Sequence, residues 1–262
     1  MNKKTFTNNK KKGFTLVELS IVLIIIGLLV TGVTAGASLI KNAELRSVMS
    51  EATGYRTAVN SFYSKYSGNF PGDYAQTIGS ATGSQLGDGD GRIEHYNDNA
   101  TAATAEGRME GNIAWQQLLN DTPSFIDGGF TPATADTSAG VWTTNLTPGT
   151  NIPESKYNNA GWVFDYEASF NASAGDNVVI ITAAMPADIG TASSSAVEAT
   201  SVAILGGGDA LSIDTKLDDG DPDTGDVGGH NSTDSNCISS GSYNTTGNTA
   251  VCALSFRISP NS

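Results

Sequence analysis

An uninterrupted apolar stretch dominates the N-terminal part of the sequence. No charged residue occurs between Leu19 and Ile40, and a helix of that length is enough to cross a hydrocarbon core of about 30 Å. Lysines precede the stretch at positions 3, 4, 10, 11 and 12, whereas the residues after it carry mixed charge. The positive-inside rule therefore predicts a single span with a cytoplasmic N-terminus and an exported C-terminal part.

The apolar pattern then changes from continuous to periodic. Hydrophobic residues recur at spacings of three and four, which is typical of an amphipathic helix. Pro71 and Gly72 force a turn soon afterwards, so we expect the helix to end near Ser67 and Gly68. An exported helix with one apolar stripe needs a surface to pack on, and a sheet is the natural candidate. The stripe consists of Leu45, Val48, Met49, Ala52, Tyr55, Val59, Phe62, Tyr63 and Tyr66.

Beyond residue 70 the sequence is polar, with short apolar islands. One island, 109–119, predicts a short helix, and another, 210–217, predicts a helical turn or two. Three others predict strands, whereas 131–151 and 218–249 are rich in turn formers and predict loops. The predicted strands are 162–166, 178–182 and 253–258.

These patterns predict an α+β fold. A long N-terminal helix, whose first half spans the membrane, packs by its second half on a small antiparallel β-sheet head with long loops. The expected organisation is a basic leader at 1–13, a transmembrane helix at 14–40, its exported amphipathic half at 41–67 and a globular head at 68–262.

The charge balance excludes one class of partner. The chain has 14 Lys and Arg against 27 Asp and Glu, and five of the basic residues lie in the leader. Without the leader the chain is more acidic still. Nucleic-acid binding depends on clustered basic residues, so none is predicted. An acidic exported surface is soluble and attracts divalent cations.

Two cysteines, Cys237 and Cys252, lie close together near the C-terminus. A bridge between them has one possible connectivity, and oxidation is expected if the head is exported. Closing so short a loop is worth about 3 kcal/mol in the chain-entropy model. Two buried free thiols are the alternative.

A carboxylate stands at the edge of the apolar stretch. Glu18 is expensive to hold in such a helix, and residues of this kind are usually paired and functional. The helix offers no cation after it before Lys41. The alternative is a carboxylate at the headgroup boundary with no special role.

The run Gly13-Phe14-Thr15-Leu16-Val17-Glu18 and the apolar stretch after it closely resemble the N-terminal signature of type IV pilins and type II secretion pseudopilins. This resemblance covers roughly residues 10–40. It implies cleavage after Gly13 by a membrane-embedded prepilin peptidase, N-methylation of Phe14 and assembly with other pilin or pseudopilin subunits. It also implies a bacterial inner-membrane location with a periplasmic head, or the cell surface once assembled.

The same resemblance gives Glu18 a role. Cleavage creates a positive amine on Phe14, and the resemblance implies that Glu18 neutralises the amine of an adjacent subunit and so sets the register of the packed helices. One departure stands out. Many members carry a proline about twenty residues after the cleavage point, whereas here the first proline is Pro71.

Two acidic runs suggest calcium. Asp88 to Glu94 alternates oxygen-bearing residues with glycines, and Asp218 to Asp226 packs several carboxylates together. Oxygen-only ligands on flexible loops are what Ca²⁺ accepts, and the second run loosely resembles the C-terminal calcium loop of major pseudopilins. Solvated acidic turns are the alternative, so no residue is assigned as a metal ligand.

Catalysis finds little support in the sequence. The only histidines, His95 and His230, show no zinc spacing, and no nucleophile-elbow motif frames a serine. We therefore expect a filament subunit and not an enzyme. The alternative from another class is a single-pass, exported calcium-binding membrane protein that does not polymerise.

Overall fold

The computed structural model describes residues 13–78, 87–93, 110–132, 145–167, 175–185, 202–231, 236–247 and 249–260. The leader lysines, Glu94 and His95 lie outside the described residues, as does the middle of the predicted loop 131–151. The chain forms two compact units, Met1–Ala43 and Glu44–Ser262.

Helix α1, Leu16–Lys65, begins in the first unit. Its apolar side chains there are exposed, from Leu16 through Ile40. Among the described helices, it is the one long and apolar enough to cross a membrane, and no part of its most apolar window is buried. Exposed leucine, isoleucine and valine at this density require an apolar partner or a lipid environment.

In the second unit α1 buries one face. Leu45, Val48, Val59 and Phe62 are almost completely buried, and Met49, Tyr55 and Tyr66 pack at the edge of the same core. This confirms the stripe predicted from the periodicity. The helix ends in a tight turn, where the Gly68 N–H donates to the Tyr63 carbonyl at 2.9 Å.

The core partner of α1 is a four-stranded antiparallel sheet with the order β1-β2-β6-β3. Side chains of alternate residues enter the core, as in Val179, which lies between Phe164 and Phe256 on the neighbouring strands. The strands are β1 Gly161–Glu167, β2 Asp176–Thr182, β3 Val227–Asn231 and β6 Cys252–Arg257. A separate hairpin pairs β4 Ile238–Ser239 with β5 Ser242–Tyr243.

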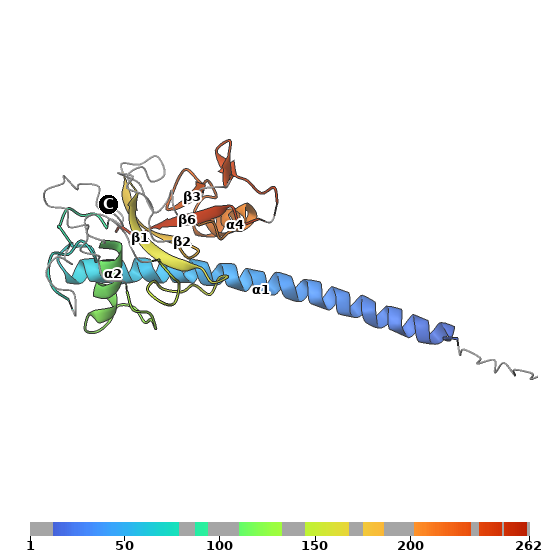
Figure 1. Cartoon of the computed structure of the whole chain (residues 1–262). Helices are drawn as coiled ribbons and strands as arrows, with labels where there is room; N and C mark the ends of the chain where they lie inside the picture. The colour runs from blue at the N-terminus through green and yellow to red at the C-terminus, as the bar shows by residue number, and fades with distance from the viewer. Residues whose placement is uncertain are drawn as a thin grey trace, which may run out of the picture. The chain divides into compact units, whose positions relative to one another are not determined.

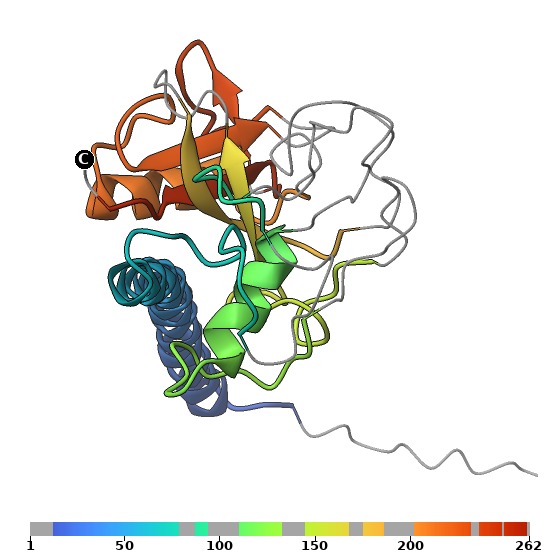
Figure 2. The same cartoon turned by 90° about the vertical axis from the view of Figure 1, so that its left-hand side faces the viewer.

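Helix α2, Glu110–Asn120, joins α1 to the sheet (Figures 1 and 2). The Trp115 ring stacks on Phe164 with centroids 4.0 Å apart and meets Tyr55 edge-on at 5.0 Å. The indole N–H of Trp162 donates to the Glu51 carboxylate at 3.0 Å. Aromatic contacts of this kind add to area burial, so α1 is held to the sheet along one face.

Helix α4, Gly207–Leu217, follows the Leu205 bridge to Cys252. Its first residue has to be small, because a Cβ on Gly207 would lie 1.9 Å from the Asn244 carbonyl oxygen. Helix α4 is longer than the helical turn or two predicted at 210–217, because it begins within the glycine run.

The prediction that 218–249 is loop throughout was wrong, because β3, β4 and β5 lie within it. Strand β3 reads Val-Gly-Gly-His-Asn and gives no apolar alternation. Its position depends on pairing with β6 and on close packing, since a Cβ on Gly229 would lie 2.7 Å from the Tyr243 ring.

The cysteines form one disulfide, Cys237–Cys252, with an S–S distance of 2.01 Å. Both residues are fully buried, and neither is a free thiol. The bridge ties the chain just before β4 to the first residue of β6. The observed architecture is the predicted α+β fold, a long apolar N-terminal helix with a small antiparallel sheet.

Candidate assembly helix and acidic clusters

The N-terminus of α1 is built around Thr15 and Glu18. Gly13 and Phe14 precede the helix outside regular secondary structure and are exposed. The Thr15 backbone N–H donates to Glu18 Oε2 at 2.7 Å, and the Thr15 hydroxyl donates to the same oxygen at 2.9 Å. In return, the Glu18 N–H donates to Thr15 Oγ1 at 3.2 Å. This is a capping box, in which two otherwise unpaired helix donors are satisfied reciprocally.

Glu18 was predicted from the sequence as a functional residue, whereas Thr15 was not. The signal was present, because a threonine three residues before a glutamate and directly ahead of an apolar run is the capping-box pattern. Both contacts reach Oε2, and no described residue hydrogen-bonds to Oε1. The carboxylate thus has one occupied and one available oxygen at the start of an exposed apolar helix.

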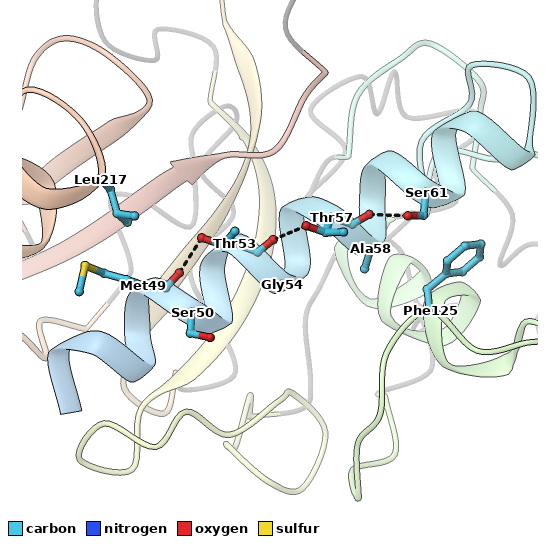
Figure 3. A pocket seen from close by; sticks show the side chains of 9 residues that line it. All are labelled: Met49, Ser50, Thr53, Gly54, Thr57, Ala58, Ser61, Phe125 and Leu217. Carbon is cyan, nitrogen blue, oxygen red and sulfur yellow. Dashed lines mark hydrogen bonds between the residues drawn. The ribbon is translucent and has the colours of Figure 1, made fainter. Parts of the chain in front are cut away.

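A shallow hollow of about 540 Å³ follows the exposed side of α1 in the head unit (Figure 3). Small residues of α1 form its floor, and no lining residue is charged. The lining residues are Met49, Ser50, Thr53, Gly54, Thr57, Ala58, Ser61, Phe125 and Leu217.

Three of the hydroxyl groups that line this hollow are satisfied within the helix. Thr53, Thr57 and Ser61 each donate at 2.8 Å to the carbonyl four residues earlier. An unpaired buried donor costs about 1–3 kcal/mol, so prior pairing removes that penalty. An apolar surface can therefore cover the hollow without leaving these donors unpaired.

The first acidic run lies next to Asp73, a residue that was not predicted to belong to it. Carboxylate oxygens of Asp73, Asp88 and Asp90 lie within 4.8 Å of one another. Asp73 is buried and accepts the N–H groups of Gly89 and Gly91 at 2.7 and 3.0 Å. Burial raises the pKa of Asp73 above its ordinary value, although these two hydrogen bonds act in the opposite direction.

The second run forms a similar cluster around the end of α4. Oxygens of Asp214, Asp218 and Asp219 lie within 4.8 Å of one another. Asp214 is fully buried and accepts hydrogen bonds from the Tyr243 hydroxyl at 2.8 Å and the Gly220 N–H at 3.1 Å. Burial raises the pKa of Asp214 to about 6.

Each cluster combines one buried carboxylate with two from the adjacent acidic run. The last residue of each predicted run is not seen in its cluster. Glu94 of the first run is outside the described residues, and Asp226 of the second run pairs instead with Arg56 and Arg257, at 3.0 and 3.1 Å. Asp73 completes the first cluster from a turn distant in the sequence, whereas Asp214 lies on α4 four residues before Asp218, a spacing that brings helix side chains together. Three converging carboxylates form an oxygen-only donor set that suits Ca²⁺.

A serine, a histidine and a glutamate also meet on the sheet. Ser255 Oγ lies 2.5 Å from His230 Nε2 and hydrogen-bonds to Glu167, whose Oε1 lies 3.1 Å from the same Nε2. A catalytic relay needs the acid on the other ring nitrogen. Ser255 is also fully buried. This arrangement joins strands β1, β6 and β3 and does not present a nucleophile.

Comparison with known families identifies the N-terminal segment. The model of the prokaryotic N-terminal methylation motif matches residues 8–34. The chain carries the prepilin-type signature. No curated protein and no solved structure matches the chain.

The prepilin-type signature is that of type IV pilins and pseudopilins, and it covers the basic run, Gly13, Phe14, the capping box and much of the apolar helix. Together with that helix it fits a membrane-anchored precursor. The motif indicates a structural protein that assembles with other pilin subunits.

Asp214 gives the head a testable pH dependence. Its folded pKa of about 6 exceeds the ordinary 3.8, so the folded chain holds this proton more tightly than the unfolded chain. The stability that this group contributes is complete below about pH 4 and is lost as the pH rises through 6. We expect Asp214→Asn to flatten this part of the stability–pH curve by about 1–3 kcal/mol, measured by urea unfolding in metal-free detergent solution.

The exposed residue Asp127 provides the control, since it belongs to neither cluster. Asp127→Asn should leave the curve between pH 4 and 6 unchanged. An Asp214→Asn curve that parallels the wild type would contradict the assignment of this pH dependence to Asp214.

Proposed function

We propose that this protein is a structural subunit of a type IV pilus-like or type II secretion pseudopilus filament. Prepilin peptidase would cut between Gly13 and Phe14, the Phe14 amine would be methylated, and the subunits would pack through α1. The observation that carries the proposal is the available oxygen of Glu18 in the first turn of an exposed apolar helix, inside a prepilin-type signature.

Two physical costs favour assembly. The apolar side chains of Leu19–Ile40 are exposed, so we expect them to remain in lipid or to pack against apolar surfaces of other subunits. A carboxylate among them is expensive unless it is paired. A neighbouring Phe14 amine, created by cleavage, supplies the opposite charge without requiring another charged side chain. Helix packing and charge pairing then drive the same association.

The hollow on α1 adds a receiving surface. Its uncharged lining and internally bonded hydroxyls suit an apolar helix. The chain as a whole is strongly acidic, with a formal charge of −13, so contacts between copies are favoured where charges are absent. We infer that the apolar segment of a neighbouring copy packs along this hollow.

Glu18 provides the direct test of the pairing. Glu18→Gln keeps a side chain that completes a capping box but removes the charge, and Glu18→Ala removes both. Because a lone amine in an apolar bundle is costly, we expect both variants to reduce filament yield at least tenfold. The measurement is the amount of subunit sheared from bacteria that carry the assembly machinery.

Glu44→Gln is the matched control, since it neutralises another carboxylate on the same helix. It should assemble within about twofold of the wild type, as expected for a charge outside the apolar segment. A wild-type filament yield from Glu18→Gln would exclude charge pairing as the driving contact. No filaments from the wild type itself would favour the non-polymerising alternative.

Gly54 tests the hollow. A Cβ at this position meets no atom within 4 Å, and leucine favours a helix over glycine by roughly 0.5–1 kcal/mol. Gly54→Leu should therefore leave the head folded, or slightly more stable, while it fills the hollow and reduces filament yield at least fivefold. Yield and melting temperature are measured on the same variant.

Ser64→Leu is the control for Gly54→Leu, because Ser64 is an exposed α1 residue that does not line the hollow. It adds the same side chain and should assemble normally. Equal yields from Gly54→Leu and the wild type would show that no neighbour occupies the hollow.

Calcium binding to the head is a second proposal, favoured by the two carboxylate clusters. Ca²⁺ would neutralise the charge that burial makes costly at Asp73 and Asp214 and would tie each acidic run to the folded head. Such a role is compatible with a filament subunit and equally with an exported calcium-binding protein that does not polymerise.

Addition of millimolar CaCl₂ to the metal-free protein should raise its melting temperature, because a ligand that binds the folded state stabilises it. Asp219→Asn should reduce the rise, and simultaneous Asp219→Asn and Asp88→Asn should remove most of it. Asp127→Asn again serves as the control. An equal rise in the double variant would assign the calcium effect to other residues.

A further inference from the structure

We propose that Thr15 is a positioning residue for assembly. It holds one oxygen of the Glu18 carboxylate in the helix cap and leaves the other free for the amine of a neighbouring copy. This inference rests on the proposed function, and it divides the carboxylate between two tasks. Oε2 completes the cap of its own helix, whereas Oε1 accepts the intermolecular contact.

The hydrogen bonds of the cap support this division. Both donors of Thr15, its backbone N–H and its hydroxyl, reach Oε2 at 2.7 and 2.9 Å. A third contact, from the Glu18 N–H to Thr15 Oγ1 at 3.2 Å, closes the arrangement. A glutamate side chain otherwise loses considerable rotamer freedom when it binds. Here the chain itself pays that cost, so the carboxylate is oriented before a neighbour arrives.

The box also survives processing. All of its atoms belong to Thr15 and Glu18, which lie on the C-terminal side of the Gly13–Phe14 bond. Cleavage at that bond removes neither the Thr15 peptide N–H nor its hydroxyl, and methylation alters only the Phe14 nitrogen. The precursor and the mature subunit therefore present Glu18 in the same arrangement, and cleavage adds the cation without rebuilding the carboxylate.

The surroundings make the second oxygen important. An ionised carboxylate accepts about four hydrogen bonds, and the cap supplies two of them to one oxygen. In an apolar bundle no water supplies the rest. A neighbouring ammonium group on Oε1 completes the set with a charge-assisted hydrogen bond. Without the Thr15 hydroxyl, Glu18 keeps its charge but loses an oriented donor and part of its fixed position.

The test uses the full chain in bacteria that carry the assembly machinery. Filament subunits are counted against processed subunits, identified by their mature N-terminal peptide, so that effects on the peptidase cancel. Thr15→Val keeps the side-chain shape but has no hydroxyl. Thr15→Gly also lacks the hydroxyl, yet glycine is an acceptable helix cap. Thr15→Ser keeps every hydrogen bond of the box.

We expect Thr15→Val and Thr15→Gly to lower the ratio of assembled to processed subunit by about fivefold, the effect of losing one net hydrogen bond to the Glu18 carboxylate. Thr15→Ser should stay within about twofold of the wild type. A wild-type ratio in the valine variant would overturn the proposal. So would a wild-type ratio in the glycine variant, because Thr15 would then act on the helix cap alone. A low ratio in the serine variant would overturn it as well.

The same assay distinguishes a failure of the role of Thr15 from a failure of the proposed filament function. No filaments from the wild-type chain would overturn the proposed function and this inference together. Equal filament yields from the wild type and Glu18→Gln would show that the carboxylate charge is not needed for assembly. Filaments from the wild type and Thr15→Val, but not from Glu18→Gln, would leave the filament function in place and overturn the role of Thr15 alone.

Discussion

The structure depends on one constraint: the apolar first half of α1 must be removed from water, and the Glu18 carboxylate in its first turn must be removed with it. The side chains from Leu19 to Ile40 are exposed in the isolated chain, and each costs free energy in water. Lipid satisfies those side chains but leaves Glu18 poorly paired. In the proposed filament, a bundle of copies would satisfy both at once, because each copy would bring an apolar surface and, after cleavage, a positive amine. The prepilin-type signature at residues 8–34 includes both Glu18 and the proposed cleavage point before Phe14.

The head is organised around the second half of the same helix. The buried face of α1 contacts the sheet through Tyr55 and Glu51, which reach Trp162 from the helix side. The opposite side keeps an uncharged hollow in which the hydroxyls of Thr53, Thr57 and Ser61 already have partners. One helix thus carries a face for folding and, in the proposed filament, a face for association. The first acidic cluster lies on a loop that is fixed to β2, where the Ile93 N–H donates to the Asn177 side chain at 2.7 Å. The second lies at the end of α4.

The elements with strong local patterns could be predicted from the sequence. The stripe of α1 and the apolar islands of β1, β2 and β6 are visible because burial on one face imposes a period. Strand β3 could not be found this way, since Gly228 and Gly229 carry no side chain and their place is defined by the β6 backbone. Periodicity reports side-chain burial, and β3 is defined by backbone pairing.

The candidate sites divide in the same way. Glu18 was identifiable because a charge stands out in an apolar run, and Thr15 was within reach through its spacing from Glu18. Asp73 was not, because it joins its cluster through a tertiary contact in which Gly89 and Gly91 fold back onto it. Asp214 was within reach through its spacing of four residues from Asp218 on a helix, but its burial and its hydrogen bond from Tyr243 of the β5 hairpin were not. Composition indicated an acidic surface but not which carboxylates converge.

The most direct measurement is the intact mass and N-terminal peptide of the chain purified from its assembled state in the producing bacterium. The account predicts a polypeptide that begins at Phe14, carries one methyl group on its amine and retains the whole apolar segment. A chain that begins after residue 40, or one that still carries its lysine-rich leader in the working assembly, would contradict it.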